Sequence, residues 1–189
     1  MDENMTSLLM PASVGNVDPT AVSRSARWKY WFSIADPRRC PECKSMHGKV
    51  YESGEPCIPS PPEHFNCRCE ILRMLCIMAG YATTEGNNGA DWWLKNVGRL
   101  PEYYMTEEEF EALGWSQGRE PARYAPSRMM TKGEYSNRNG HLPSANGRTW
   151  YEADINYHRG RRNSQRILWS NDGLMFVTYN HYKTFIEIH

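Results

Sequence analysis

The sequence predicts an α+β protein, in which N-terminal helices pack on an antiparallel β-sheet and a small cysteine-rich module precedes both. Three observations predict this fold. All six cysteines of the 189-residue chain lie before residue 77. Helix signals follow in residues 91–114, and from about residue 148 apolar side chains recur with a period of two. Helices followed by a run of strands is the order of an α+β fold.

The composition of the chain divides it into four segments. The stretch AGYATTEGNNGA, residues 79–90, is rich in Gly, Asn and Thr and separates the cysteines from the helix signals. Such a composition is typical of a flexible linker. We therefore expect a flexible N-terminus at residues 1–25, a cysteine-rich module at 26–76, a linker at 77–90 and a second domain at 91–189.

Two short helices open the second domain. The segment DWWLKNVG, residues 91–98, has apolar side chains at helical spacing and a glycine that can end a helix. In TEEEFEALGW, Thr106 can cap the helix and Glu109 follows three residues later, which predicts a capping box. Gly114 is placed to close this second helix.

The strands of the second domain begin with TWYEADINY, residues 149–157. Side chains alternate along it, so Glu152 and Asp154 lie on one face while Ala153 and Ile155 lie on the other. The first pair predicts a polar, solvated face. The stretch that follows contains two or three more strands, with SNDG as a tight turn.

The charge balance limits the classes of function. Lys+Arg and Asp+Glu number 22 each, so any nucleic-acid contact must depend on a local basic cluster. No stretch approaches the roughly 18 apolar residues of a membrane span, and acids precede the short apolar run at the amino terminus, which argues against a signal peptide. We expect a cytoplasmic or virion-associated protein, whose cysteines bind metal rather than form disulfides.

The chemistry of the chain is concentrated in YEADINYHRGRRNSQRIL, residues 151–168, where carboxylates face a cluster of arginines. RNA carries its own nucleophile, the 2′-hydroxyl, so cleavage needs a base, an acid and a phosphate clamp, and no metal. Glu152 is the candidate base and His181 the candidate acid. Arg162 and Arg166 can grip a phosphate through bidentate hydrogen bonds. Taken singly, each is more often a solvated surface group.

Several motifs carry a resemblance to a known family. The segments LPEYYMTEEEFEALGW, SNRNGHLP, GRTWYEADINYHRGRRNSQRILWSNDG and NHYKTF occur in order over residues 90–189. Together they resemble the barnase-like family of microbial, guanyl-preferring ribonucleases. The resemblance implies the fold of that family and cleavage of single-stranded RNA by transesterification to a 2′,3′-cyclic phosphate, followed by hydrolysis, with no cofactor for catalysis.

The resemblance also implies roles for individual residues. It gives catalysis to Glu152, His181, Arg162 and Arg166, and substrate binding to Asn137, Arg138, Tyr182 and Ser164. It further implies a structural ion pair between Arg148 and Asp172.

Two positions depart from the pattern of that family. Glu107 stands where the family has a cleft lysine, unless Lys132 or Arg128 reaches in as a substitute cation. Asn139 stands where the family has a glutamate that accepts hydrogen bonds from guanine, and an amide offers one acceptor and adds a donor. These departures leave two functions open: an active endoribonuclease, or a non-enzymatic virion-associated or RNA-binding protein with a decayed site.

The cysteine spacing predicts a structural metal site. Cys40-x-x-Cys43 and Cys67-x-Cys69 can present four thiolates to one Zn²⁺, and His64 lies nearby in the sequence. Such a site would stabilise a region with little core of its own. Free buried thiols, or a disulfide formed after lysis, are the alternative.

A second resemblance covers the cysteine-rich part. The segments DPRRCPEC, HGKVY and PPEHFNCRCE, within residues 28–72, resemble the C-terminal part of phage minor head (head morphogenesis) proteins. Cys57 and Cys76 lie outside the paired spacing. The resemblances imply single-stranded RNA as substrate, a barstar-like acidic inhibitor as partner, phage capsid or portal proteins as further partners, and a toxin role.

Overall fold

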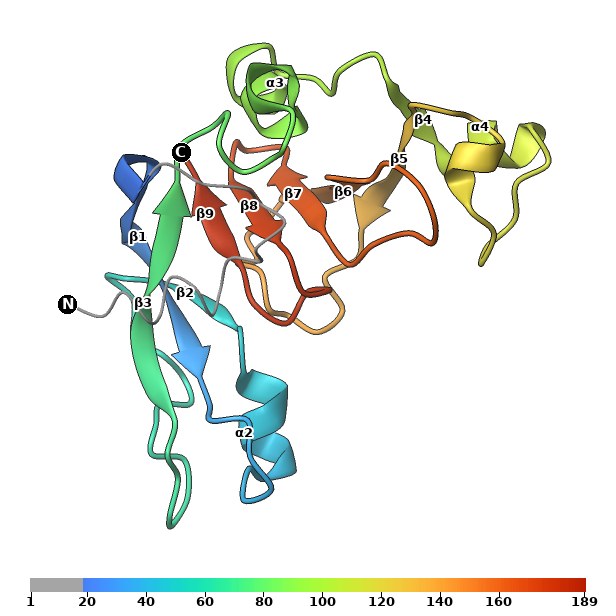
Figure 1. The fold of residues 1–189 in the computed structure, drawn as a ribbon. Coiled ribbons are helices and arrows are strands. Elements are labelled where there is room, and N and C mark those ends of the chain that lie inside the picture. The colour runs from blue at the N-terminus through green and yellow to red at the C-terminus, as the bar shows by residue number, and fades with distance from the viewer. Residues whose placement is uncertain (1–18) are drawn as a thin grey trace.

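The computed structural model describes residues 19–189, and its main feature is one nine-stranded sheet (Figure 1). The strand order is β2-β1-β3-β9-β8-β7-β6-β5-β4, and only β3–β9 and β4–β5 pair in parallel. The strands are β1 Val22–Phe32, β2 Val50–Glu52, β3 Glu70–Ile77, β4 Tyr104–Thr106, β5 Met129–Tyr135, β6 Trp150–Asp154, β7 Arg166–Ser170, β8 Met175–Thr178 and β9 Ile186–Ile188. The predicted α+β class is confirmed.

Three α-helices and three 3₁₀-helices complete the described chain. They are η1 Pro19–Ala21, α2 Pro41–Met46, η2 Gly86–Asn88, α3 Ala90–Asn96, α4 Glu107–Ala112 and η3 Pro121–Arg123. The predicted capping box of α4 is present: Thr106 Oγ1 accepts from the Glu109 amide at 3.2 Å, and Glu109 Oε2 accepts from the Thr106 amide at 2.7 Å. Gly98 closes α3 in the left-handed conformation, with φ +79°.

The sheet is covered on both faces. One core cluster includes Ile77, Ile155, Ile167 and Val177, and Leu94 of α3 packs against it. A second of the three core clusters includes Trp28 and Met74 of the cysteine-rich part together with Trp150, Leu168 and Phe176 of the second domain. The Trp28 and Phe176 rings meet edge to face at 5.7 Å. Both clusters therefore draw side chains from both halves of the chain.

The predicted polar face of β6 is buried instead of solvated. Glu152 is 8% exposed and Asp154 only 1% exposed. The predicted alternation of β6 is present, because Ala153 and Ile155 pack in the first cluster, on the other face of the sheet. The difference arises because Tyr182, in the loop after β8, contacts Glu152, while Arg162 and Arg166 contact Asp154. Buried carboxylates need charged or hydrogen-bonding partners, so this burial shapes the site.

The segment expected as a flexible linker is an ordered turn. The amides of Gly80 and Ala82 donate to Asp91 Oδ2 at 2.7 and 2.9 Å, and Thr83 Oγ1 donates to Asp91 Oδ1 at 2.8 Å. Asp91 is completely buried. A buried carboxylate that accepts three hydrogen bonds fixes the backbone around it, whatever the composition of that backbone.

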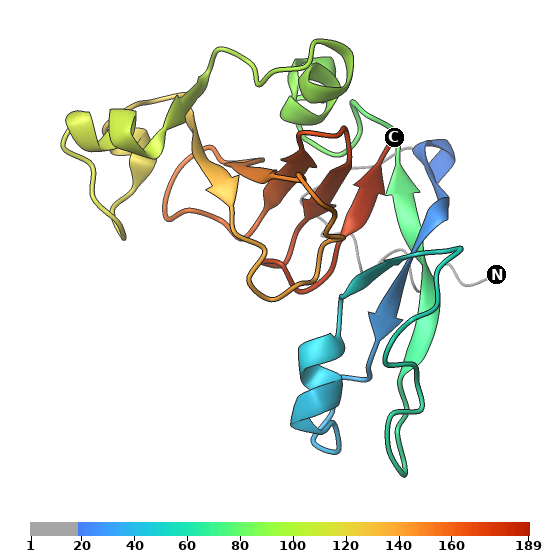
Figure 2. The same ribbon diagram turned by 180° about the vertical axis from the view of Figure 1, so that it is seen from behind.

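The expected N-terminal flexibility concerns residues 1–25, of which 1–18 lie outside the described residues. Within the described part, η1 and the start of β1 occupy residues 19–25. The strand β3 lies beside β9, so the cysteine-rich part continues the sheet of the second domain (Figure 1). Seen from behind, the loop between β5 and β6 lies beside α2 and β2 (Figure 2), where the Val50 amide donates to the His141 carbonyl at 2.8 Å.

Candidate active site and cysteine cluster

The candidate base Glu152 sits in the middle of β6. Its backbone pairs with Leu168 of β7 and with Gly133 of β5. Its carboxylate Oε2 accepts a hydrogen bond of 2.5 Å from the Tyr182 hydroxyl. Burial, and next the bond to Glu152, raise the pKa of Tyr182 above its usual value. The phenol therefore stays protonated as a donor, and the carboxylate is held in one orientation.

The candidate acid His181 lies in the loop after β8, directly before Tyr182. Both residues have positive φ, +57° and +63°, a conformation that costs a non-glycine residue on the order of 1–3 kcal/mol. Hydrogen bonds hold them there: the His181 amide donates to the Ser164 carbonyl at 2.9 Å, and the Tyr182 amide donates to Thr178 Oγ1 at 3.0 Å. The result is an exposed imidazole 4.8 Å, ring to ring, from the tyrosine that contacts Glu152.

The two candidate phosphate-binding arginines share one buried carboxylate. Asp154 Oδ2 accepts from Arg162 Nε at 2.7 Å, and Asp154 Oδ1 lies 3.0 Å from Arg166 Nε. Arg166 is 4% exposed, whereas the Arg162 side chain is 20% exposed. Asp154 thus fixes both guanidinium groups, which lowers the entropy that they would lose on gripping a phosphate.

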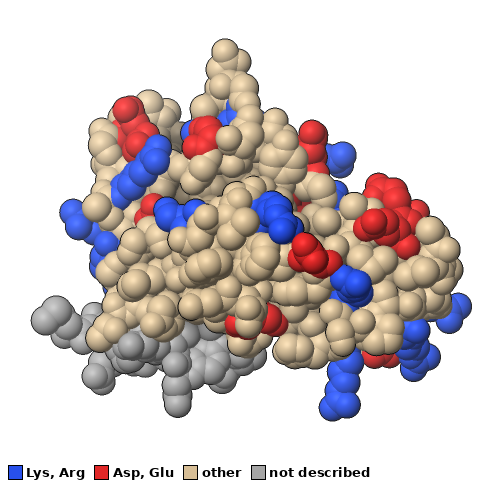
Figure 3. Space-filling model, turned by 90° about the horizontal axis from the view of Figure 1, so that it is seen from above, with Lys and Arg blue, Asp and Glu red and all other residues tan. Residues whose placement is uncertain are grey.

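These groups border an open cleft of about 590 Å³. Four arginines contribute to its lining, which consists of Trp115, Gln117, Gly118, Arg119, Arg161, Arg162, Asn163, Ser164, Arg166 and His181. Glu152 is not part of this lining and reaches the region through Tyr182. Over the face seen from above, both signs of charge are scattered, and acidic side chains gather at the end that carries α4 (Figure 3). The basic character of the cleft is therefore local, as the balanced composition requires.

The predicted base-recognition loop follows β5. Asn137 has φ +44°, and its side chain bonds within the loop, donating to the Leu142 carbonyl at 2.9 Å and accepting from the Leu142 amide at 3.1 Å. Arg138 is exposed. The Tyr135 ring at the start of the loop stacks on the Tyr182 ring, with centroids 5.2 Å apart. The structure therefore brings this loop to the same tyrosine that contacts Glu152.

The acid at position 107 has a cationic partner. Lys132 Nζ lies 2.9 Å from Glu107 Oε1, and both side chains are about three-quarters covered. Lys132 occupies the irregularity in the pairing of β5 with β6, next to Gly133, the partner of Glu152. Arg128 is engaged elsewhere, because its Nη1 donates to the Glu102 carbonyl at 2.6 Å. Lys132 is therefore the cation beside Glu107, the residue that replaces the cleft lysine of the family.

The expected ion pair between Arg148 and Asp172 is present. Arg148 Nη2 lies 2.8 Å from Asp172 Oδ2, and Nε donates to the same carboxylate at 3.0 Å. The bond from Arg148, and next that from Ser170, lower the pKa of Asp172 to about 2. This pair joins the loop before β6 to the β7–β8 turn.

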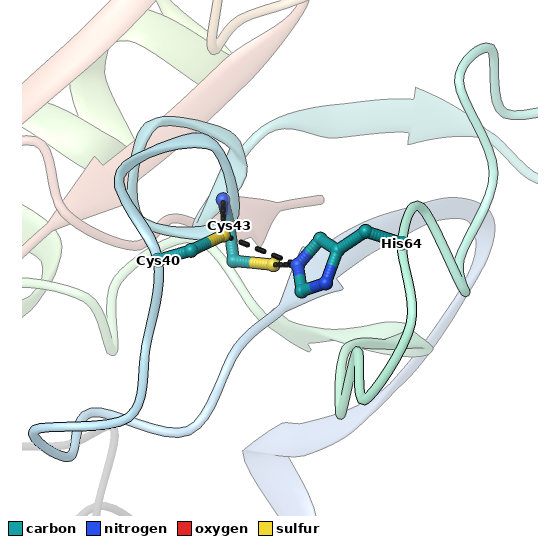
Figure 4. A group of neighbouring side chains, drawn as sticks. All are labelled: Cys40, Cys43 and His64. Carbon is teal, nitrogen blue, oxygen red and sulfur yellow. Dashed lines mark hydrogen bonds between the residues drawn. The ribbon is translucent and has the colours of Figure 1, made fainter.

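The cysteine cluster gathers more donors than the sequence prediction named. The Nε2 atom of His64 lies 3.1 Å from the sulfurs of Cys40 and of Cys43, as Figure 4 shows. Cys67 and Cys69 complete a second group around Cys43, whose Sγ lies 3.8 Å from that of Cys67. Within each group the donor atoms lie within 4.8 Å of one another.

The sequence prediction places His64 near the four cysteines without making it a ligand, and the His-x-x-Cys spacing to Cys67 is the signal that identifies it. Its Nδ1 lies 2.8 Å from the Phe65 carbonyl, which can only accept. The proton therefore sits on Nδ1, and Nε2 is free to act as a metal ligand.

The remaining two cysteines belong to neither group. Cys57 is half-buried. Cys76 is 5% exposed, and burial raises its pKa to about 12; its sulfur lies 2.9 Å from His189 Nδ1. Neither sulfur adds a ligand to the cluster.

A carboxylate and an imidazole joined through a tyrosine, beside an arginine-lined cleft, are the parts of an acid–base phosphodiesterase. The chain belongs to the ribonuclease family, whose family model, described as ribonuclease, matches residues 90–189. The ribonuclease of Heyndrickxia coagulans is 46% identical over 103 residues, which cover 53% of this chain and 94% of that protein. The ribonucleases of Bacillus intermedius and Bacillus pumilus are also 46% identical over 103 residues, 63% of their length.

The cysteine-rich part matches a different family. A model described as Phage Mu protein F like protein matches residues 14–72. The two matches meet the expectations from both sequence resemblances. Across the described residues, the helices are too short and too polar to cross a membrane.

Proposed function

We propose that the chain is an endoribonuclease that cleaves single-stranded RNA by metal-independent transesterification. The observation that carries this proposal is the bridge from Glu152 through Tyr182 to the loop of His181, at the edge of an arginine-lined cleft. General acid–base catalysis needs two groups on opposite sides of one reacting centre, and this bridge keeps them in one region.

The reaction follows from the roles of these groups. Glu152 takes the proton of the 2′-hydroxyl, the 2′-oxygen attacks phosphorus, and the bond from phosphorus to the 5′-oxygen breaks. His181 donates its proton to that leaving oxygen, which gives a 2′,3′-cyclic phosphate and a free 5′-hydroxyl. In the hydrolytic step the roles reverse: neutral His181 activates water and protonated Glu152 returns its proton to the 2′-oxygen. Arg162 and Arg166, fixed by Asp154, stabilise the charge that develops on the phosphoryl oxygens.

Binding of the RNA base is assigned to the loop after β5 and the loop of the acid. Asn137 and Arg138 lie on the first, and Ser164 lines the cleft beside His181. The Tyr135 and Tyr182 rings, already stacked, offer an aromatic surface between the two loops. Guanine preference is not assigned, because Asn139 replaces the acceptor expected at that position.

The test is cleavage of a labelled RNA oligonucleotide by the full chain in EDTA, without added divalent cations. Glu152→Gln and His181→Gln each remove one proton-transfer group, so we expect each to slow cleavage by about 10²- to 10⁴-fold. Glu111→Gln and His158→Gln are matched controls at exposed positions. Wild-type cleavage that requires Mg²⁺, or that survives both active-site substitutions, would contradict the proposal.

The alternative is a protein that binds RNA without cleaving it. It is favoured only if the departures at Glu107 and Asn139 remove catalysis. The ion pair of Glu107 with Lys132 counts against this, because the Lys132 ammonium, 2.9 Å from the Glu107 carboxylate, offsets its negative charge. RNA binding by the wild-type chain with no cleavage above the His181→Gln background would favour the alternative.

We also propose that the cysteine cluster holds one structural Zn²⁺. Thiolates and imidazole are the donors that zinc prefers, and His64 presents a free Nε2. Tetrahedral ligands about 2.3 Å from zinc stand about 3.8 Å apart, which matches the separation of the Cys43 and Cys67 sulfurs. The site offers one donor more than four-coordinate zinc needs, so one of Cys40, His64, Cys67 and Cys69 is a spare.

The role that we propose in the cell is that of a toxin or effector domain on a phage-head-type protein. A ribonuclease of this kind requires restraint, and a basic cleft fits a barstar-like acidic inhibitor that would cover it. The match of residues 14–72 to a phage head family supports capsid or portal proteins as further partners and a virion-associated or cytoplasmic location. Native co-purification tests these partners, and the absence of any acidic protein bound to the chain would count against an inhibitor.

A further inference from the structure

One side chain of the base-recognition loop is held by the cysteine-rich part of the chain. The His141 ring points at α2, where its Nε2 lies 3.0 Å from the carbonyl oxygen of Ser45. The backbone is held as well, because the Val50 amide of β2 donates to the His141 carbonyl at 2.8 Å. The contact with Ser45 joins residues that are 96 apart in the sequence.

The contact with Ser45 decides which ring nitrogen carries the proton. A carbonyl oxygen only accepts, so Nε2 of His141 is the donor. In the neutral imidazole Nδ1 is then an acceptor, and the Asn139 amide nitrogen donates to it at 3.1 Å. The same Nδ1 lies 3.4 Å from the Tyr182 carbonyl oxygen, to which it would donate only in the doubly protonated ring. The Asn139 oxygen accepts in turn from the His141 backbone amide at 3.2 Å. The side-chain amide of Asn139 consequently has one orientation, with both ends fixed.

Asn139 stands at the position where base recognition is expected, and it is exposed. After its two bonds to His141 its oxygen keeps one lone pair for a ligand, and its second N–H faces the Tyr135 phenol, which a base would have to share. An amide that presents a donor and an acceptor can pair with a purine edge, and adenine is the usual partner of asparagine in nucleic-acid recognition. A freely rotating amide would present the two groups in either order, so its orientation affects selectivity.

The cysteine-rich part also packs against the loop that carries His181. Gly48, with φ +86°, comes so close to Lys183 that a Cβ on it would lie 1.9 Å from the Lys183 carbonyl oxygen. Lys183 is two residues after His181 and next to Tyr182. The segment from Ser45 to Val50 therefore touches both loops that border the proposed substrate.

We propose that His141 is a positioning residue for base selection, and that it acts because the cysteine-rich part holds it: Ser45 fixes the ring of His141, and the ring orients the amide of Asn139. This proposal rests on the ribonuclease function proposed above. It makes the phage-head-like segment part of the substrate-recognition site and not only a tether.

The experiment measures kcat and KM of the full chain on the dinucleoside monophosphates ApA, GpA and UpA. His141→Ala should lower the ratio of kcat/KM for ApA over UpA about fivefold, the effect of one lost hydrogen bond. The change should lie in KM for ApA, with kcat on UpA unchanged, because the catalytic groups are untouched. Asn139→Glu, which offers only acceptors, should raise the GpA-to-ApA ratio.

Two substitutions of His141 separate its contact with Asn139, in the same loop, from its contact with Ser45 of α2. His141→Asn keeps an acceptor near Asn139 but is too short to reach Ser45, whereas His141→Gln can reach Ser45 but lacks an acceptor at the place of Nδ1. The proposal expects both to lose selectivity. In an Asn139→Ala background, His141→Asn should have no further effect on the ratio. This double-mutant cycle of His141→Asn and Asn139→Ala tests the proposal even if His141→Ala fails to fold.

Each outcome decides something. His141→Asn with the wild-type ratio would overturn the contribution of the cysteine-rich part. An Asn139→Ala chain with the wild-type ratio, or a wild-type chain that cleaves all three substrates equally, would overturn the proposal and leave the ribonuclease function standing. A wild-type chain that cleaves none of the three substrates, nor any longer RNA, would contradict the ribonuclease function itself.

Discussion

The two halves of the chain share one sheet but are stabilised by different interactions. The ribonuclease half buries charged side chains, as Asp154 with Arg162 and Arg166 illustrates. The cysteine-rich half packs Trp28 and Met74 on side chains of the other half. Farther from the sheet it depends on a group of thiols and one imidazole.

This contrast teaches that family boundaries and structural boundaries differ here. The two family matches end and begin at residues 72 and 90, while the sheet crosses that interval through the pairing of β3 with β9. The loops of the cysteine-rich half that lie away from the sheet expose large apolar side chains, with Phe65 at 92% and Ile58 at 77%. A half that covers its apolar groups so incompletely gains most from a metal and from its partner half.

The largest expected effect concerns the metal. If the cluster holds zinc, the purified chain contains about one zinc ion, and removing it forfeits binding free energy on the order of 10 kcal/mol at pH 7. Cys43→Ser, which removes the sulfur common to both groups, should abolish zinc binding and lower the melting temperature. Cys57→Ser is the matched control, because Cys57 belongs to neither group. Metal analysis and thermal unfolding measure both; a zinc content that is unchanged in Cys43→Ser would contradict the site.

A smaller but still large effect is expected at the buried charges of the ribonuclease half. Asp154→Asn leaves two arginines without their counter-ion, one of them 4% exposed, and should cost about 3–5 kcal/mol of unfolding free energy. Asp36→Asn breaks an arginine pair on the cysteine-rich half, at a partly exposed site, and should cost less because water screens the charge. Urea unfolding measures the free energy of unfolding of both variants. Equal losses in the two would contradict the claim that the ion pairs of the ribonuclease half contribute more because they are more deeply buried.

The contact between the halves is tested at Gly48. Alanine there combines a strained positive φ with a backbone clash against Lys183, and should cost roughly 2–3 kcal/mol. Gly54→Ala, in the same half but with nothing within 4 Å of the new Cβ, should have little effect. Thermal unfolding and RNA cleavage are measured on both. A Gly48→Ala chain as stable and active as Gly54→Ala would show that the halves do not pack together as described.

The smallest effect concerns the ion pair of Arg148 with Asp172, whose side chain is 45% exposed. The pKa of Asp172 is lowered to about 2, so the folded state favours the ionised carboxyl, which contributes stability above the unfolded pKa of about 4. This contribution is lost as the pH falls from about 4 towards 2. Wild type should therefore melt above Asp172→Asn at pH 7, and the difference should shrink on acidification. A difference in melting temperature between wild type and Asp172→Asn that grows below pH 4 would contradict this prediction.

Local features of the sequence predicted local features of the structure. The Thr106–Glu109 capping box depends on residues three apart, and alternation placed Glu152 and Asp154 on one face of β6. The sequence alone named His181 as the candidate acid, whereas Asn137, Arg138 and Tyr182 were named from the family resemblance, whose motifs keep their order and spacing.

What sequence reasoning missed depends on contacts between distant residues. The order of the 79–90 turn depends on burial of Asp91, which composition does not reveal. Cys76 meets His189 across 113 residues, and His141 meets Ser45 across 96. No local pattern encodes these pairings, because the partners are distant in the sequence and meet only in the folded chain. The burial of Glu152 likewise follows from the covering loop and not from its own strand.

The central claim, that the 2′-hydroxyl of RNA is the nucleophile activated by Glu152, is tested most directly by one substrate change. The full chain is incubated in EDTA with an RNA oligonucleotide and with the same oligonucleotide carrying a single 2′-deoxy nucleotide at the cleaved position. Cleavage of the first to a 2′,3′-cyclic phosphate, and none of the second at that position, is the predicted result. Cleavage of the 2′-deoxy linkage at a comparable rate would contradict the account.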